Sequence, residues 1–506
     1  MSFAERCGQD SLERRAACAS LLKLIDASGI DQIRLSWCDQ HGQLRGKTLT
    51  PRAIAKTLQD GIGMVSTILL KDTSDRTVYK VFEEGGVADL PGFEAASNLV
   101  LLPDPASYQQ LPWAHKTGWL QCQAWFQNGE PVQLDTRRVL QNALQNLKQA
   151  GFAMQCGLEV EFHIYKIADG GLPNSPNPLD PLDPLDPDQA AWPGLPPAVQ
   201  MIHPGYNLLS ESWSDRCALP LRIVQDTCDA LGLPLTSLEI ELGPSQVEAV
   251  FDVTDALTAA DNMVRFRSGV TQALGRAGYH ASFMCRPPFP NIMSSGWHLH
   301  QSLIEIETGR NAFSREQPGA GTSPSDAEFT LSATGAQWLA GLLAHAPAMA
   351  ALAVPTINGF ERFRPNALAP QSIVWGHDNR GAMLRVIGAA GDGSTHIENR
   401  IGEPAANPYL YIASQIHAGL DGIHRQLKAP PATLAPYREA APEGPARLPA
   451  SLGEALEALR GDAIYTQGFG QTFIDYFCRV KQSELDRHAL AEDKADWQKR
   501  EYFSRI

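Results

Sequence analysis

Residues 376–385 read Gly-His-Asp-Asn-Arg-Gly-Ala-Met-Leu-Arg, and residues 396–402, after a Gly-rich loop, read His-Ile-Glu-Asn-Arg-Ile-Gly. The two runs set charged residues among short apolar ones in a strand-like pattern, among them Arg380, Arg385, Glu398 and Arg400. Such a density of charge is unfavourable in a protein interior unless anions and a metal ion bind there. This stretch therefore predicts a site that handles phosphate.

The rest of the chain has the composition of an ordinary globular protein. Its 506 residues are 43% hydrophobic and 19% charged, enough for a large core and, by length, for two domains. The net charge of −14 argues against nucleic acid or an acidic membrane as a partner, because the summed field repels both. Any anionic substrate must therefore be held by local arginines.

Cysteine usage and the lack of long apolar segments indicate the compartment. The nine cysteines are scattered and never spaced Cys-x-x-Cys, so neither a disulfide framework nor a zinc site is expected. The N-terminus lacks the apolar run of a signal peptide, and no apolar stretch is long enough to span a bilayer. We expect a soluble protein of the cytoplasm.

Periodicity and turn residues predict an α+β organisation. Helical periodicity is clearest at residues 11–27, 255–277 and 332–352, and residues 33–37 and 44–50 read as a β-hairpin. We expect a small domain over residues 1–115 and a large one over residues 116–506. Three Pro-rich stretches, 170–197, 315–325 and 429–449, are expected to be surface loops of the large domain.

Polar residues recur at positions i and i+2 of four strand-like segments: Glu159 with Glu161, Glu239 with Glu241, His298 with His300, and Glu398 with Arg400. One such pair alone is typical of a solvent-exposed strand face. Four pairs on apolar strands instead predict a sheet face that binds divalent cations, because clustered carboxylates repel one another unless a cation neutralises them. Oxygen ligands with one histidine favour Mg²⁺ or Mn²⁺ over zinc.

Six motifs make the chain resemble the glutamine synthetase family. They lie at residues 157–162 (Gly-Leu-Glu-Val-Glu-Phe), 241–248 (Glu-Leu-Gly-Pro-Ser-Gln-Val-Glu), 295–303, 358–363, 379–385 and 397–400, the last followed by Pro-Ala-Ala-Asn-Pro-Tyr-Leu at 404–410. They run in the family's order over nearly the whole chain. The resemblance implies an N-terminal β-grasp-like domain and a large catalytic domain whose antiparallel, barrel-like sheet forms the active site.

The resemblance also implies a role for individual residues. One cation would be held by Glu161, Glu241 and Glu248, and the other by Glu159, His298 and Glu398. The catalytic arginines would be Arg362, Arg380 and Arg400, of which Arg362 and Arg400 bind glutamate and Arg380 lies between glutamate and the γ-phosphate. Ser294 and Gly296 fall in the glutamate-binding loop, and the nucleotide side would contain His300, Ser302, Arg380 and Arg385.

The implied reaction is ATP-dependent amide formation. Glutamate's γ-carboxylate attacks the terminal phosphate, and an amine then displaces phosphate from γ-glutamyl phosphate. The family also implies a homo-oligomer of stacked hexameric rings, with the active site between the N-terminal domain of one subunit and the large domain of the next. A non-catalytic assembly protein on the same fold would have no physical reason to keep six metal ligands and four arginines together.

Departures from the family pattern bear on the amine. Glutamine synthetases that use ammonia have an acidic residue where this chain has Leu368, and a second acid from a neighbouring subunit where this chain has residues 63–68, including Val65. An ammonium ion buried between these apolar side chains would lose its hydration without replacement. An apolar amine such as aniline, uncharged at pH 7, suits the pocket better. The sequence of residues 375–380 is also similar to that of the family branch whose members γ-glutamylate anilines, alkylamines or polyamines.

Several alternatives stay open. A polyamine would bring a second cation, for which Glu361 could supply an acid, so a γ-glutamylpolyamine or alkylamine synthetase ranks second and glutamine synthetase proper third. His396, Gly393 and Met293 also depart from the family pattern and leave the nucleotide and glutamate contacts at those positions open. The sequence does not decide between Mg²⁺ and Mn²⁺, nor whether Tyr437 is modified.

Overall fold

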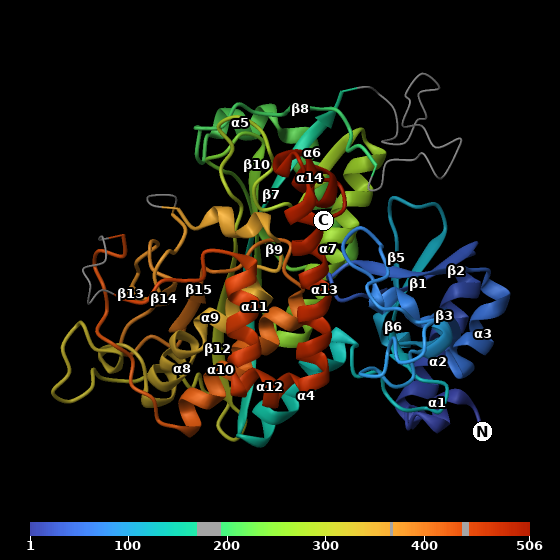
Figure 1. The fold of residues 1–506 in the computed structure, drawn as a ribbon, viewed down its shortest axis with the longest axis horizontal. Helices are drawn as coiled ribbons and strands as arrows, with labels where there is room; N and C mark the ends of the chain where they lie inside the picture. The colour runs from blue at the N-terminus through green and yellow to red at the C-terminus, as the bar shows by residue number, and fades with distance from the viewer. Residues whose placement is uncertain (169–193, 365–367, 438–444) are drawn as a thin grey trace.

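The computed structural model describes residues 1–168, 194–364, 368–437 and 445–506 (Figure 1). The expected loop at residues 170–197 lies outside the described residues up to residue 193, and the loop at 429–449 is described except for residues 438–444. Within the described ranges, two sheets and their helices confirm the α+β class expected from the sequence.

The N-terminal part is built on a six-stranded sheet of order β2-β1-β6-β4-β3, with β5 paired to β6. Its strands are β1 (Gln32–Cys38), β2 (Leu44–Leu49), β3 (Ile62–Val65), β4 (Asn98–Pro103), β5 (Gln109–Gln110) and β6 (Thr117–Trp125). The antiparallel pair β1–β2 confirms the predicted hairpin. The strand β6 runs parallel to β1 and lies beyond residue 115, so this sheet extends past the expected domain boundary into the segment assigned to the large domain.

Short helices accompany this sheet. They are α1 (Phe3–Arg6), α2 (Leu12–Ala27), α3 (Pro51–Asp60) and the 3-10 helices η1 (Ser66–Leu70), η2 (Glu94–Ala96) and η3 (Pro105–Ser107). The predicted helix at 11–27 is α2, which begins after Ser11 because the Ser11 hydroxyl accepts a hydrogen bond from the Arg14 amide at 3.2 Å. In Figure 1 this N-terminal part lies to one side of the rest of the molecule.

A nine-stranded sheet forms the centre of the large part, in the order β13-β14-β15-β12-β7-β10-β9, with β8 and β11 also paired to β7. Its strands are β7 (Phe152–Ile167), β8 (Val199–Met201), β9 (Leu235–Ile240), β10 (Gln246–Asp255), β11 (Tyr279–Ser282), β12 (Trp297–Glu305), β13 (Trp375–His377), β14 (Leu384–Ile387) and β15 (His396–Asn399). Neighbouring strands are antiparallel, as expected, except β13 and β14, which run parallel.

Helices cover this sheet, and the central one, α10, packs against α4, α7, α8, α9 and α12. Their bounds are α4 (Thr136–Gln149), α5 (Glu211–Arg216), α6 (Ala218–Leu231), α7 (Ala256–Arg276), α8 (Ala333–Ala344), α9 (Ala346–Ala353), α10 (Pro408–His424), α11 (Leu452–Gly461), α12 (Ala463–Phe469), α13 (Gln471–Leu490) and α14 (Lys494–Tyr502), with 3-10 helices η4 (Ala327–Phe329) and η5 (Asn358–Arg362). The predicted helix at 255–277 is α7, whose N-cap is Asp255.

The single helix predicted at residues 332–352 is wrong, because two helices stand there. Helices α8 and α9 are bent by 76° at His345. Pro347 lies in the first turn of α9, where its missing amide proton is tolerated, but a continuous helix would need that proton. Among the described residues no single helix is long and apolar enough to cross a membrane; only this bent pair, whose residues are largely buried in the core, meets that length and composition together.

A buried polar network ties the N-terminal part to the last helices. Arg487 on α13 pairs with Asp72 at 2.9 Å and also with Glu501 on α14. The Thr73 and Ser74 hydroxyls donate to the Glu501 carboxylate, which is fully buried, as is Asp72. The turn at residues 72–74 is thus held by side chains from the opposite end of the sequence.

Candidate active site

Four carboxylates gather on one face of the large sheet. Strand β7 contributes Glu159 and Glu161, β10 contributes Glu248 directly opposite Glu161, and Glu241 follows the end of β9. Since strand residues at i and i+2 share a face, the two β7 side chains point the same way, as the sequence predicts. Oxygen atoms of Glu161, Glu241 and Glu248 all lie within 4.8 Å of one another, close enough to share one cation.

A second group of ligands adjoins the first. His298 lies opposite Glu159 in the β7–β12 register, with its Nδ1 atom 3.1 Å from Glu159 Oε2 and 3.6 Å from Glu398 Oε1. The structure therefore brings together the three residues that the resemblance implies for the second cation. His300 also reaches this group, since its Nε2 atom lies 3.1 Å from Glu159 Oε1 and it could form a cation site with Glu159 and Glu398.

The charges in these groups fit divalent cations. Burial, together with neighbouring carboxylates, raises the pKa of Glu161 to about 7 and that of Glu248 to about 10, so these groups cannot all ionise without a compensating cation. Burial, with Arg400 nearby, lowers the pKa of His298 to about 4 and leaves the imidazole neutral, the state that binds metals. Carboxylate oxygens with one histidine suit Mg²⁺ or Mn²⁺.

Arg362 is buried beside the second group and is held firmly. Its Nη1 donates to the Arg400 carbonyl at 2.7 Å and also to the next two carbonyls of the chain, while Nη2 lies 3.3 Å from His298 Nε2. A Cβ atom on Gly296 would lie only 2.4 Å from Arg362 Nη2, so a larger residue there would displace the guanidinium. The Gly296 amide in turn donates to Glu161 Oε2 at 2.6 Å, which links the arginine to the first ligand group.

Arg385 and Arg400 flank Glu398 from both sides. Arg385 Nη1 lies 3.0 Å from Glu398 Oε2, and Arg400 pairs with the other oxygen of the same carboxylate. Burial opposes ionisation of Glu398, but His298 and Arg400 lower its pKa below the ordinary value. Arg385 is also paired with Asp378, so part of its charge is already compensated.

The structure does not gather every expected residue. Arg380 is exposed on the turn after β13, and the Ser294 hydroxyl accepts a hydrogen bond from Arg286 at 3.1 Å. Leu368 is 54% exposed, and its carbonyl accepts a hydrogen bond from Arg400 Nη2 at 3.4 Å. Val65 lies on β3 of the N-terminal sheet, at the opposite side of the view in Figure 1 from strands β13 and β14. Val65 and Leu368 of the same chain are therefore not neighbours.

A cavity of about 470 Å³ opens beside Glu159. It is lined by residues of β7, β10 and β12, by the loop before β15 and by the start of β15, including His300, Ser302, Gly393 and His396. His300 and Ser302, both expected on the nucleotide side, thus share one cavity next to the carboxylates.

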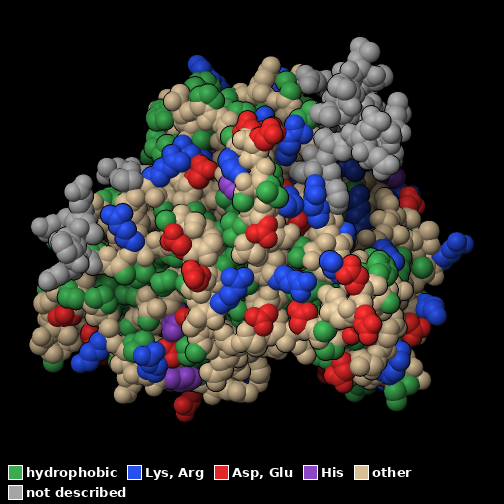
Figure 2. Space-filling model, viewed as in Figure 1, with side chains coloured by type: hydrophobic (Ala, Val, Ile, Leu, Met, Phe, Trp, Pro, Cys, Tyr) green, Lys and Arg blue, Asp and Glu red, His purple; other side chains and the backbone are tan. Residues whose placement is uncertain are grey.

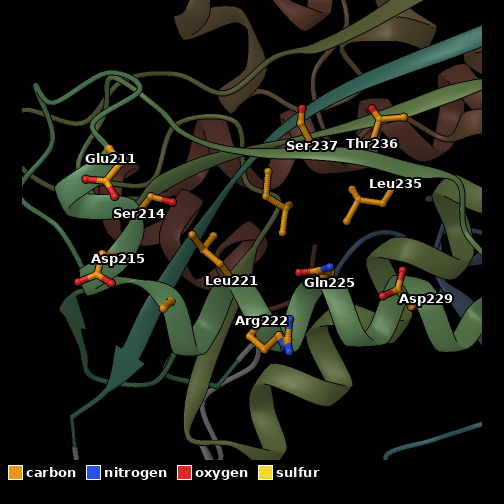
Figure 3. A pocket seen from close by; sticks show the side chains of 12 residues that line it. Glu211, Ser214, Asp215, Leu221, Arg222, Gln225, Asp229, Leu235, Thr236 and Ser237 are labelled. Atoms are coloured by element: carbon orange, nitrogen blue, oxygen red, sulfur yellow. The ribbon is translucent and has the colours of Figure 1, made fainter.

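A larger cavity, of about 710 Å³, lies between α5, α6 and β9 (Figure 3). The described residues that line it, such as Glu211, Arg222 and Asp229, include none of the expected site residues. On the face in Figure 2, acidic and basic side chains are interspersed, with no large patch of one sign. The candidate site is therefore the carboxylate face of the sheet, where the expected cation ligands lie.

Three residues that hold the site together were given no supporting role by sequence reasoning. Gln246 donates from Nε2 to Glu161 Oε2 at 3.3 Å, and its Oε1 accepts from the Gly243 amide, which fixes the orientation of the side-chain amide. Asp378 contacts Arg385, and His396 Nε2 lies 3.1 Å from His300 Nδ1. All three stand within or beside the quoted motifs, but their partners come from other strands and only the fold reveals them.

Comparison with known proteins agrees with this geometry. Residues 133–502 match the model of the glutamine synthetase catalytic domain. The chain is 37% identical to the gamma-glutamylanilide synthase of an Acinetobacter species, covering 97% of this chain and 96% of that protein. It is 30% identical to the glutamine synthetase of Thermus thermophilus (93% and 96% covered) and 30% identical to the glutamate–isopropylamine ligase of a Pseudomonas species (94% and 96% covered).

Solved structures agree as well. A GmaS/ADP complex has a TM-score of 0.73 at 26% identity, with 93% of this chain and 97% of that chain covered. A match to the catalytic-domain model over most of the chain, and relatives at 30% identity or more along almost its whole length, establish that this protein belongs to the glutamine synthetase family as a glutamate–amine ligase.

Proposed function

We propose that this enzyme joins the γ-carboxylate of L-glutamate to an apolar amine, with aniline as the best candidate. The observation behind the proposal is Leu368, a half-exposed apolar side chain whose carbonyl is hydrogen-bonded to Arg400. At this place in the family an acid binds ammonium, so the leucine removes the ammonium partner and offers an apolar surface. The 37% identical relative described as a gamma-glutamylanilide synthase supports the same choice.

Two divalent cations, Mg²⁺ or Mn²⁺, are assigned to the carboxylate face. Glu161, Glu241 and Glu248 would hold one, and Glu159, His298 and Glu398 would hold the other. When bound, such cations supply screening and polarisation of the terminal phosphate of ATP. ATP is assigned to the cavity of about 470 Å³ with His300 and Ser302. Arg385, which lies opposite Glu398 on the neighbouring strand, is proposed to bind its phosphates.

Arg362 and Arg400 are proposed to bind glutamate. An oxygen of the γ-carboxylate attacks the terminal phosphorus of ATP, and ADP leaves. The amine nitrogen then attacks the γ-carbonyl carbon, the bond to the phosphate oxygen breaks, and the nitrogen loses a proton to water. Arg380, on its exposed turn, is proposed to meet the transferred phosphate, where a guanidinium stabilises the developing charge.

The amine pocket contains no assigned base, and an apolar arylamine does not need one. Aniline is uncharged at pH 7, so its nitrogen attacks without first losing a proton, whereas ammonium must be deprotonated. Contact with Leu368, and with Val65 from a second copy of the chain, would supply binding through burial of apolar surface.

A second candidate is an alkylamine, since the 30% identical glutamate–isopropylamine ligase is also similar along 94% of this chain. The polyamine alternative is weaker, because Glu361, the acid that a distal ammonium would need, is paired with Arg364 at 3.3 Å.

The test is glutamate-dependent phosphate release from ATP with ammonium, aniline, isopropylamine and putrescine, compared as kcat/KM. We expect aniline to give the highest value and ammonium the lowest. Preference for ammonium would make the protein a glutamine synthetase in the strict sense, and preference for putrescine would direct attention to Glu361.

A further inference from the structure

Leu368 holds a backbone conformation that leucine avoids. Its φ angle is 52°, in the left-handed region, where the Cβ atom crowds the following carbonyl. Non-glycine residues keep such angles only where their surroundings enforce them, and they cluster at functional sites. The contacts around this turn therefore decide where the Leu368 side chain points.

Two hydrogen bonds hold the turn, one on each of two successive carbonyls. Arg400 Nη2 donates to the Leu368 carbonyl at 3.4 Å, and Tyr437 Oη donates to the Ala369 carbonyl at 3.1 Å. Arg400 already belongs to the proposed glutamate site. Tyr437 comes from a segment 68 positions further along the chain and has no assigned role in the reaction.

Tyr437 is itself held in place by the phosphate side of the site. Its ring packs on Gly381, where a Cβ atom would lie 3.0 Å from Tyr437 Cε2. Asn379 Nδ2 donates to the Thr433 carbonyl at 3.0 Å and fixes the same segment. One short segment, residues 433–437, thus touches the turn that carries Arg380 and the turn that carries Leu368.

The hydroxyl of Tyr437 stays protonated and can donate. Burial raises its pKa above the ordinary value, although Arg400 and Arg362 act in the opposite direction. Because Arg400 and Tyr437 donate to successive carbonyls of the same turn, the Tyr437 hydroxyl lies beside an arginine of the proposed glutamate site.

We propose that Tyr437 is a positioning residue for amine selection, whose hydroxyl holds the Leu368 turn so that the leucine side chain, and not the backbone, lines the amine pocket. The amine-pocket role of Leu368 rests on the proposed function. A purely structural role for Tyr437 would instead alter stability and affect the three substrates alike.

The test is Tyr437→Phe, which removes only the hydroxyl and keeps the ring on Gly381. We expect KM for aniline to rise about fivefold, the value of one hydrogen bond, with KM for glutamate and ATP unchanged. The preference for aniline over ammonium should fall by a similar factor. Tyr465→Phe is the matched control. Tyr465, on α12, also donates from Oη to a backbone carbonyl, that of Ser414 on α10 at 3.2 Å, but it does not contact the Leu368 turn.

A double variant keeps the test decisive. In a Leu368→Gly background the left-handed angle is no longer strained and the side chain is gone, so Tyr437→Phe should have no further effect on KM for the amine. Additive effects of the two changes would overturn the proposal, as would an equal rise of all three KM values or no rise in any. If the unmodified enzyme prefers ammonium, the proposed function fails, while the role of Tyr437 is still judged by whether KM for the amine alone moves.

Discussion

Glu161 shows how a single side chain of the proposed cation site is held in place. One of its oxygens accepts hydrogen bonds from the Gly296 amide and from Gln246 Nε2, so the carboxylate cannot rotate freely. Outer partners of this kind orient metal ligands and raise affinity. The side chain is thus placed against Glu241 and Glu248 before any cation arrives.

Glu161→Gln should weaken cation binding by more than about 100-fold, because a neutral amide cannot supply the charge that the cation needs, and even outer-shell losses cost about 10–100-fold. Activity should be lost while the circular dichroism spectrum is kept. Isothermal titration with Mn²⁺ measures the affinity. Glu239→Gln is the control, since Glu239 lies on β9 beside the cluster but outside the three ligand groups; equal losses in both variants would contradict the assignment of Glu161.

Leu368→Glu should shift preference toward ammonium. The carboxylate gives the ammonium ion a partner and leaves an unpaired charge against an apolar amine, so kcat/KM for aniline should fall at least about tenfold, equivalent to about 1.4 kcal/mol. Steady-state kinetics with both amines measure the shift. Leu490→Glu, on a leucine that is 86% exposed at the end of α13, controls for added charge; an unchanged ratio of the two amines in Leu368→Glu would remove the basis of the pocket argument.

The residues of the proposed cation sites could be located from the sequence because their signal is local. The alternation of Glu159 with Glu161, or of His298 with His300, needs only the two-residue period of a strand. Gln246 and Asp378 could not be predicted, because their roles depend on partners from other strands or turns. Arg380 was expected among buried charges, but it lies on an exposed turn, where strand-like spacing says nothing about burial.

At the scale of elements, the break between α8 and α9 brings a histidine between two acids. His345 Nε2 lies 2.9 Å from Asp421 Oδ2 on α10, and His345 Nδ1 lies 2.6 Å from Asp462 Oδ2, the N-cap of α12. Although burial opposes its charge, the two carboxylates raise the pKa of His345 above the ordinary value. A charged imidazole can donate to both acids, whereas a neutral one can donate to only one.

The pairing of His345 with Asp421 and Asp462, called the His345 clamp below, predicts that the stability of the fold depends on pH. Because the folded pKa is raised, the contribution of His345 is fully present below its unfolded pKa of about 6.5 and is lost as the pH rises through the folded value. His345→Gln should therefore lower the unfolding midpoint more at pH 6 than at pH 9, with a free-energy difference of about 1.5–3 kcal/mol, one hydrogen bond to a charged group. Thermal unfolding across this pH range measures it.

His424→Gln is the control for the clamp, because His424 is an exposed histidine at the end of α10. Its effect should not depend on pH in the same way. A His345→Gln penalty that is constant from pH 6 to pH 9 would show that the imidazole acts only by packing.

The start of a helix was predictable where the capping residue is a neighbour in the sequence. The break between α8 and α9 was not predictable, because it depends on contacts with other helices. Ser11 and Asp255 mark the starts of α2 and α7 as the sequence suggests. The apolar run at residues 332–352 continues through His345, so periodicity alone joins the two helices; the bend is set by Pro347 and by the two acids that hold His345.

At the scale of the whole molecule, we predict a ring-forming homo-oligomer whose dissociation removes activity. One chain leaves Val65 away from Leu368, so a second copy must supply that wall of the pocket if Val65 takes part. Light scattering combined with activity measurements on diluted enzyme checks this expectation. An active monomer would show that the family's shared site does not apply here.

Mixed assemblies can test the shared pocket directly. In a double variant, E161Q is expected to inactivate the large domain of the subunit that carries it. V65E changes the N-terminal surface that this subunit presents to the active site of its neighbour. Reassembled with unmodified subunits, the double variant should shift amine preference toward ammonium, because only unmodified large domains catalyse the reaction. Assemblies with E161Q alone are the control; identical preferences in the two mixtures would exclude Val65 from the neighbouring site.

The α+β class was predictable from sequence, but the strand order was not. The hairpin β1–β2 follows from a local turn, whereas β6 joins the N-terminal sheet by pairing parallel to β1 across more than 80 residues. Nothing in the sequence near residue 115 signals that pairing, because parallel partners are set by the fold and not by a turn.

The network that joins residues 72–74 to the last helices also affects when the N-terminal part can complete its contacts during synthesis. Thr73 and its partner Glu501 are 428 positions apart, so at a synthesis rate of about 5–20 residues per second the turn waits about 20–90 seconds for its partner to emerge from the ribosome. During that interval Asp72 has no Arg487 to pair with. The turn at residues 72–74 of each new chain therefore gains these partners only when translation is almost finished.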